Sequence, residues 1–179
     1  MSIISNLILI ANIVAFLSSL VLVLTGLIND KKRILIGSAF QKFLACISNV
    51  MLEGYSGAIG NVIGIVRNYL CYKDKLNITV KILLTIIQAL LYLIFDDFNA
   101  ITLLPFLATV LYTFLMVYDA KKLKVLTIIT TILWAIYNFY IQSYAGFVFK
   151  ILSIITNIIG LFKISKINKN NKNTQKNSP

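Results

Sequence analysis

Histidine is absent from this chain of 179 residues, and only six residues are acidic. Without histidine the chain lacks the commonest general base and the commonest metal ligand. Asp96 and Asp97 are adjacent, but no second acidic group repeats at their face of the predicted bundle, as a membrane enzyme would require. We therefore predict that the chain is not an enzyme and has neither a cofactor nor a metal site.

Cysteine is scarce as well. Cys46 and Cys71 each stand alone in an apolar run, without the spacing of a disulfide or a metal pair. This pattern favours two small, buried, apolar side chains. The sequence also contains no nucleotide-binding loop, so we do not expect this chain alone to drive transport with ATP.

Apolar residues are what the chain has in excess. Hydrophobic residues make up 59% of it and charged residues 13%, whereas soluble domains are about half apolar and a quarter charged. Most of the chain lies in apolar runs, which have about the length of a membrane-spanning helix or, in the third run, slightly less. The runs cover residues 6–28, 34–52, 56–72, 78–95, 100–118, 125–141 and 144–162.

The breaks between these runs alternate in charge. Three are rich in lysine, at residues 30–33, 73–75 and 119–122, while the other three contain no basic residue. Basic residues in short loops mark the cytoplasmic side, so seven spans predict an outer N-terminus and a cytoplasmic C-terminus. The net charge of +11 then favours attraction to anionic lipid rather than nucleic acid.

An internal repeat appears when the numbering is shifted by 89. The shift superimposes identical residues without a gap and predicts two copies of a three-helix unit. An even number of spans between the copies would invert the second one, so a single linker span keeps them parallel. Identical pairs include Asp30 with Asp119, Asn49 with Asn138, Tyr55 with Tyr144, Gly57 with Gly146 and Asn68 with Asn157.

The predicted fold is an all-α integral membrane protein with seven transmembrane helices in a 3+1+3 arrangement. Residues 1–76 form the first bundle, 77–99 the linker helix and 100–165 the second bundle. Residues 166–179, rich in lysine and asparagine, are expected to form a disordered cytoplasmic tail.

Two resemblances follow from these features. The stretch 49–68, with its Glu53-Gly54-Tyr55-Ser56-Gly57 turn, resembles the bacterial inner-membrane YgjV family. The arrangement of parallel repeats is similar to that of the SWEET and PQ-loop superfamily, which vitamin transporters of the PnuC type share. These resemblances imply a carrier in the bacterial cytoplasmic (inner) membrane. SWEET-type carriers place a hinge proline in the first helix of each bundle, but here only Pro105 fits that pattern.

Polar residues recur on single helix faces within the apolar runs. Small residues and amides at this spacing indicate either a packed helix seam or the lining of a path. The SWEET resemblance implies a site role for Asn68, Asn157 and Trp134, although an aromatic ring is equally typical of bundle packing. The predicted substrate-binding residues are Asn49, Asn61, Asn68, Asn138, Asn157, Trp134, Lys42 and Lys150.

Lys42 and Lys150 are the most unusual of these residues. Lys42 lies near the middle of its run, and neither lysine has an acidic residue at its predicted depth. A lysine inside a membrane usually faces a cavity, although Lys150 is close enough to an end to extend to the surface. We expect one or both lysines to attract an anionic or electron-rich solute.

The function predicted from these patterns is that of a carrier for a small polar solute. A sugar-like, vitamin-like or anionic metabolite would cross by facilitated diffusion, since no acid or histidine lies at depth to couple protons. The alternative is a scaffold, or a subunit of a complex, that transports nothing. The expected partners are the solute and the lipid bilayer, without nucleic acid, and a homo-oligomer is compatible with the sequence.

Overall fold

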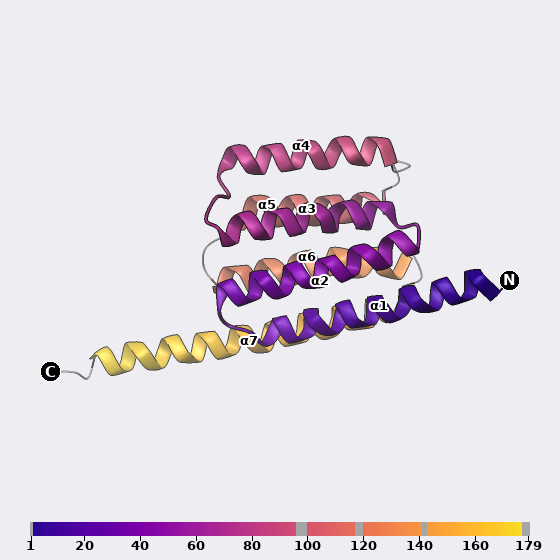
Figure 1. Ribbon diagram of the computed structural model, residues 1–179. Coiled ribbons are helices and arrows are strands. Elements are labelled where there is room, and N and C mark those ends of the chain that lie inside the picture. The colour runs from indigo at the N-terminus through magenta and orange to yellow at the C-terminus, as the bar shows by residue number, and fades with distance from the viewer. Residues whose placement is uncertain (1, 96–99, 117–119, 141–142, 177–179) are drawn as a thin grey trace.

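The computed structural model describes residues 2–95, 100–116, 120–140 and 143–176, which form seven α-helices and no strand (Figure 1). The predicted all-helical fold is therefore confirmed. Asp96, Asp97 and Asp119 lie outside the described residues. The helices are α1 (Ser2–Leu27), α2 (Lys31–Met51), α3 (Tyr55–Tyr72), α4 (Ile78–Phe95), α5 (Leu103–Leu115), α6 (Ala120–Tyr140) and α7 (Tyr144–Lys176).

Equivalent hydrogen bonds lie between α2 and α3 and between α6 and α7. The Gly54 N–H donates to the Asn49 carbonyl at 2.8 Å, and the Ser143 N–H donates to the Asn138 carbonyl at 2.9 Å. Such bonds satisfy carbonyl groups that a helix end leaves unpaired. Glu53 supplies the left-handed conformation of the first turn, with φ of 58°. The two hydrogen bonds are 89 positions apart, as are both ends of α2 and α6.

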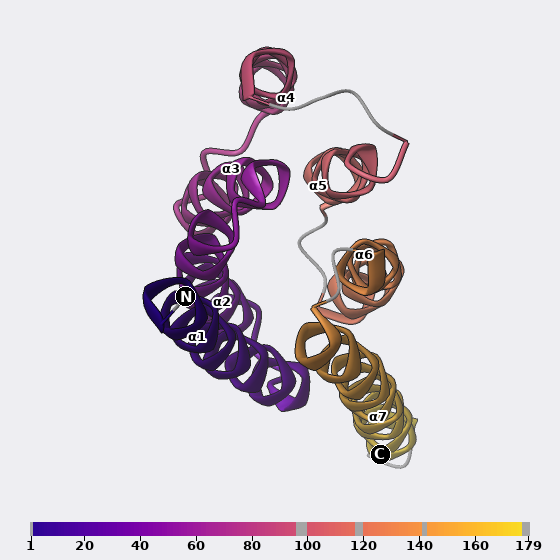
Figure 2. The same ribbon diagram turned by 90° about the vertical axis from the view of Figure 1, so that its right-hand side faces the viewer.

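The helices form two facing rows (Figure 2). One row contains α1, α2 and α3 in sequence order, and the other contains α5, α6 and α7. The rows meet at both edges, where α1 packs against α7 and α3 against α5, and α4 packs on the outside against α3 and α5. Six helices thus enclose one interior. The division into two parallel bundles and a linker remains a prediction, and α4 is the helix that would be its linker.

Five helices of the described chain are long and apolar enough to cross a membrane, against the seven spans that we predicted. The two others are α5, which has only 13 residues and a length of about 20 Å, and α3. In α3 the apolar run is interrupted by Asn61, Arg67 and Asn68, which are all buried. The polar residues that lower the hydropathy of α3 therefore face the protein interior and not the lipid.

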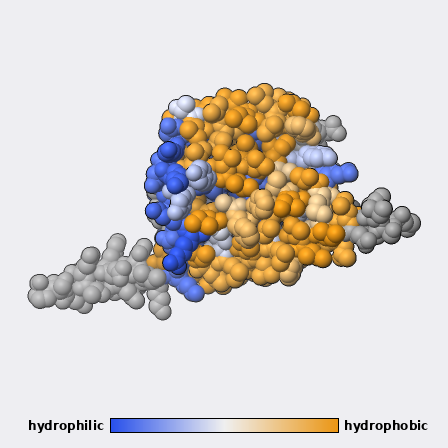
Figure 3. Space-filling view, viewed as in Figure 1, coloured by the Kyte–Doolittle hydropathy of each residue, from blue (hydrophilic) through white to orange (hydrophobic). Residues whose placement is uncertain are grey.

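The face of the bundle seen in Figure 3 is mostly apolar, and one of its ends is hydrophilic. Large hydrophobic side chains are exposed along the outer helices, for example Leu93 and Ile94 of α4, as contact with lipid tails requires. The lysine-rich segments after α1, after α3 and at the start of α6 lie together at the end toward which the C-terminus projects. We call this the basic end. Its cytoplasmic orientation remains a prediction.

The C-terminal tail differs from our expectation. We predicted disorder from residue 166, but α7 continues as a helix to Lys176 and projects beyond the bundle (Figure 1). No proline or glycine interrupts the chain between Gly160 and Pro179. An isolated polar helix is unstable because its first turn is costly to form. The tail extends a helix that already exists and so avoids this cost, which explains why it is helical.

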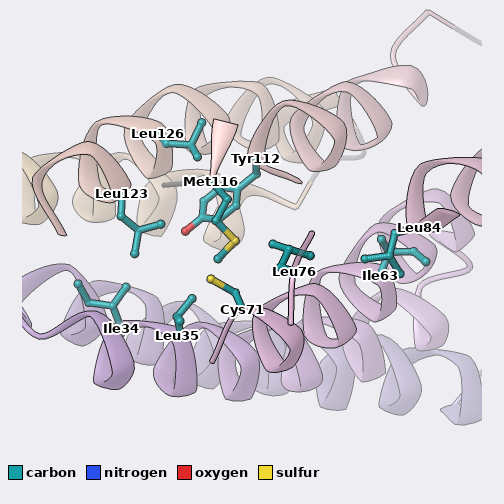
Figure 4. Packing of buried hydrophobic residues seen from close by; sticks show 10 residues of the cluster. All are labelled: Ile34, Leu35, Ile63, Cys71, Leu76, Leu84, Tyr112, Met116, Leu123 and Leu126. Atoms are coloured by element: carbon teal, nitrogen blue, oxygen red, sulfur yellow. The ribbon is translucent and has the colours of Figure 1, made fainter. Parts of the chain in front are cut away.

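An apolar cluster fills the interior near the basic end (Figure 4). Met116 and Leu123 point into the cluster from one row, and Leu35 and Cys71 point into it from the other. Leu35 and Leu123 are 1% and 0% exposed. The two rows are therefore packed together at this end. The buried members are Ile34, Leu35, Ile63, Cys71, Leu76, Leu84, Tyr112, Met116, Leu123 and Leu126.

Candidate functional site

Two polar cavities adjoin one another between the rows of helices. The first, which we call the cation cavity, is lined by Lys42, Arg67 and Lys150 and has a volume of about 40 Å³. The second, which we call the amide cavity, is lined by Asn49 and Asn138 and also has a volume of about 40 Å³. Among its described residues, the cation cavity is lined by α1, α2, α3, α5, α6 and α7. Both rows thus contribute to it.

Four residues line both cavities and so lie between them: Gln41, Asn61, Trp134 and Lys150. Gln41 is held in place, because its Nε2 donates to Ser18 Oγ at 3.1 Å. Asn61 is different: it is only 2% exposed, and its Nδ2 has no hydrogen-bond partner in the described part of the chain. A buried donor without a partner is costly, so the amide of Asn61 is available to a bound molecule.

Two lysines lie close to Trp134, which is one of the residues between the two cavities. Lys42 Nζ lies 5.8 Å from the centre of the Trp134 ring, and Lys150 Nζ lies 5.7 Å from it. Lys42 comes from α2, Lys150 from α7 and Trp134 from α6. The negative face of an aromatic ring attracts cations within about 6 Å. Trp134 therefore helps to hold two like charges, one from each row, near one another.

Arg67 adds a third cation from α3. It is 1% exposed, and its Cζ lies 4.2 Å from the centre of the Tyr112 ring. Its Nε and Nη2 both donate to Asn68 Oδ1, at 3.2 and 3.0 Å, and its Nη1 donates to the Thr109 carbonyl at 3.4 Å. These contacts orient the guanidinium group, and all of its partners are neutral.

No acidic side chain balances these charges among the described residues that line the two cavities. Asp30, Glu53 and Asp74 lie at helix ends, and Asp74 pairs there with Lys31 at 3.5 Å. A cation inside a bilayer costs about 2.5–3.5 kcal/mol on insertion scales. Three uncompensated cations at one cavity are therefore a strong indication of a functional site.

A family model for Imp-YgjV, described as a bacterial inner membrane protein, matches residues 9–168. The chain belongs to this family. The match confirms the YgjV resemblance inferred from the stretch 49–68, and it describes the family as a bacterial inner membrane protein. The comparisons with curated proteins and with solved structures gave no match. The SWEET-like architecture of this YgjV-family protein therefore remains a prediction.

Asn49 and Asn138 have equivalent surroundings in the two halves. Each lines the amide cavity, and each side chain lies against a glycine of the following helix. A Cβ on Gly57 would meet the Asn49 amide, and a Cβ on Gly146 would lie 2.9 Å from Asn138 Nδ2. The glycines thus make room for the two asparagines. This explains why the repeat keeps both residue types in both copies.

The other predicted pair, Asn68 and Asn157, is absent from the described lining of both cavities. Asn68 accepts the hydrogen bonds of Arg67 and acts behind the cation cavity. Asn157 Nδ2 donates to the Ser153 carbonyl at 2.9 Å and lies beside Gly26, at the seam between α1 and α7. The structure thus brings Lys42, Lys150, Asn61 and Trp134 together without these two asparagines.

Arg67 is the site residue that our sequence analysis missed. Gly60, Gly64, Arg67 and Cys71 recur at spacings of four, three and four, which places them on one helix face. All four are buried. The signal was present, but the site residues that we predicted on this helix were Asn61 and Asn68.

A further cation, Lys124 of α6, is 1% exposed and has a different role. Its Nζ donates to the Gly26 carbonyl at 2.5 Å, one of the last carbonyls of α1, which have no partner within the helix. Positive charge is favourable at that end of a helix. Gly160 gives the ammonium room, because a Cβ there would lie 2.5 Å from Lys124 Nζ. Lys124 is therefore a helix cap and not part of the cation cavity.

A third and larger pocket opens at the end opposite the basic end. This end pocket has a volume of about 450 Å³ and is lined by Glu53, Tyr55, Tyr137 and Ser143 among others. Ser143 also lines the amide cavity. Near the pocket floor, Ser56 Oγ and Tyr137 Oη share a hydrogen bond of 2.8 Å. The end pocket, the amide cavity and the cation cavity thus follow one another along the bundle.

Proposed function

We propose that this inner-membrane protein is a carrier that moves a small polar solute across the membrane by alternating access. One observation supports the proposal above all: three polar spaces, the end pocket, the amide cavity and the cation cavity, follow one another along the bundle. Ser143 is common to the first two spaces, and Trp134 and Lys150 are common to the last two. The series stops before the basic end, where the apolar cluster packs the rows together.

Polar spaces that begin at one end and stop before the other are what a carrier requires in one of its states. A carrier holds its solute near the middle of the membrane and opens to one side at a time, by moving one repeat against the other. The cation cavity lies between the two rows, since residues of both rows line it, so movement of one row against the other would open it. A scaffold has no need of an interior with unpaired polar groups, which cost free energy when buried.

Reconstitution into liposomes tests the proposal. The purified protein is incorporated into vesicles, and uptake is measured for a panel of labelled polyols, amines and small anions. The carrier predicts saturable uptake of at least one class. A scaffold would leave every uptake equal to that of protein-free vesicles, and this result would contradict the proposal.

A pair of matched variants ties uptake to the cavities. Ala45 lines the amide cavity, whereas Ile47 on the same helix is 39% exposed on the outside. Ala45→Leu adds three carbon atoms to a space of about 40 Å³ and is expected to abolish uptake. Ile47→Leu keeps the volume of an outward side chain and is expected to preserve it. Equal uptake by both variants would show that the solute does not pass through the amide cavity.

A further inference from the structure

We propose that the cation cavity binds a small oxyanion, of the size of acetate, nitrate or phosphate, and that this anion is the transported solute. The part concerning transport rests on the proposed function, while anion binding does not. The argument has three steps: the charge of the cavity, its hydrogen-bonding groups and its size.

The charge of the cavity is positive and lacks an internal counter-charge. Lys42, Arg67 and Lys150 line it from three helices, and no described lining residue is acidic. Within the described chain, neither lysine Nζ has a hydrogen-bond or ion-pair partner, and both lie over the Trp134 ring. Like charges held together are stabilised by an anion placed between them. A neutral solute would leave this repulsion in place.

The nitrogen groups of the cavity that remain unpaired are all donors. Three of the N–H groups of Arg67 are occupied, so two of its five have no partner in the described chain. Asn61 Nδ2 is also unpaired, and each ammonium supplies three more donors. Oxyanions accept hydrogen bonds without donating any when fully ionised, so they match this set better than a sugar, whose hydroxyls also donate.

The size of the cavity excludes large anions in this conformation. A buried water needs roughly 10–15 Å³ of such space, and the cation cavity offers about 40 Å³. The space therefore accepts a few heavy atoms and not a nucleotide or a vitamin.

The positive charge is also distributed unevenly along the series of spaces. Of the three cations, only Lys150 lines both cavities, whereas Lys42 and Arg67 line the cation cavity alone, so positive charge increases from the end pocket inward.

Thermal unfolding of the full-length protein in detergent tests the binding. Sodium acetate, nitrate, phosphate and chloride are compared at equal ionic strength with sodium gluconate, which is too large for the cavity. We expect at least one small oxyanion to raise Tm in a saturable way. Equal Tm values in all salts would overturn the proposal, and a shift by chloride alone would overturn its restriction to oxyanions.

Matched variants locate the site. Lys42→Met removes a cation from the cavity, while Lys75→Met removes one from an exposed loop at the basic end. We expect Lys42→Met to weaken anion binding at least about tenfold, as loss of a charged hydrogen bond does, and Lys75→Met to leave it unchanged. If Lys42→Met does not fold, Lys150→Met and the charge-conserving Lys42→Arg serve instead. An unchanged affinity in Lys42→Met, or in Lys150→Met if Lys42→Met does not fold, would place the anion elsewhere.

Vesicle uptake then separates the two proposals. Uptake of a small oxyanion that is lost in Lys42→Met and retained in Lys75→Met supports both. Uptake of a neutral solute without anion binding would retain the carrier and overturn the anion. Anion binding without any uptake would retain the binding site and overturn the carrier.

Discussion

Lys42 of α2 lies directly against Gly64 of α3. A Cβ on Gly64 would be 2.6 Å from Lys42 Cδ and 3.2 Å from its Nζ. The lysine therefore reaches the cation cavity only because the facing residue has no side chain. In the second half, the equivalent positions are Thr131 and Ser153, so this contact breaks the internal repeat.

The first prediction concerns Gly64. Gly64→Ala forces the stem of Lys42 to move and shifts its ammonium away from Trp134, at an overpacking cost of about 1–3 kcal/mol. We expect anion affinity to fall severalfold while the protein still folds, because a flexible side chain can yield. Thermal shift titration measures the change. Gly54→Ala is the control, since its nearest neighbours would be 3.5 Å away. An affinity equal to that of the wild type would separate Lys42 from the site.

The second prediction concerns Trp134. Trp134→Leu removes the ring that attracts both Lys42 and Lys150, a contribution of about 1–2 kcal/mol or roughly tenfold in affinity. Trp134→Phe keeps an aromatic face and should retain part of the affinity. Isothermal titration of the detergent-solubilised protein measures both. If the two variants lose affinity equally, Trp134 acts through packing alone and not through its aromatic face.

The third prediction uses Asn68 and Asn157, which the repeat makes equivalent. Asn68→Asp puts a carboxylate at the oxygen that accepts Arg67, 3.0 Å from Nη2, so the protein should keep or gain stability while anion binding disappears. Asn157→Asp instead removes the amide donor to the Ser153 carbonyl and should lower stability by about 1–3 kcal/mol without a specific effect on the anion. Melting curves with and without anion separate the two effects. Intact binding in a well-folded Asn68→Asp protein would exclude Arg67 from the site.

These two asparagines also show how far sequence reasoning reaches. Apolar runs predicted the helices, because a lipid environment demands long apolar segments. The run 34–52, for instance, overlaps nearly all of α2. Lys42, Lys150 and Trp134 stood out as unusual residues in such runs, and the structure brings them together. Asn68 and Asn157 were equally conspicuous, yet one binds Arg67 and the other lies at a seam. Which neighbour an amide meets depends on packing between helices, and the spacing along one helix does not contain that information.

The short helix α5 illustrates a second limit. Its run was predicted over residues 100–118, but the helix covers only Leu103–Leu115. Hydropathy reports which residues avoid water, and not where the backbone turns. Hydropathy also misses α3 as a membrane span. Its polar residues lower the mean hydropathy, although they are buried in the protein interior.

The fourth prediction concerns the driving force. Within the described residues that line the cavities there is no acid to carry a proton, and the whole chain has no histidine. We therefore expect anion uptake to follow the membrane potential, changing about tenfold in equilibrium accumulation for each 60 mV imposed on a monovalent anion. Vesicles with an imposed potassium diffusion potential measure this. Uptake that instead follows an imposed pH gradient at zero potential would contradict facilitated diffusion.

The last prediction concerns movement at the basic end. Cys71 is 3% exposed within the apolar cluster, so it should react slowly with a membrane-impermeant thiol reagent in the state described here. Alternating access requires the cluster to separate when the basic end opens. In a Cys46→Ala background, the labelling rate of Cys71 should therefore rise or fall severalfold when a transported solute shifts the balance between the two states. Mass spectrometry of the labelled protein measures this rate, and gluconate at equal ionic strength is the control. A rate that is the same in every salt, in protein that demonstrably binds an anion, would mean that binding does not move the cluster, and the carrier mechanism would fail at that step.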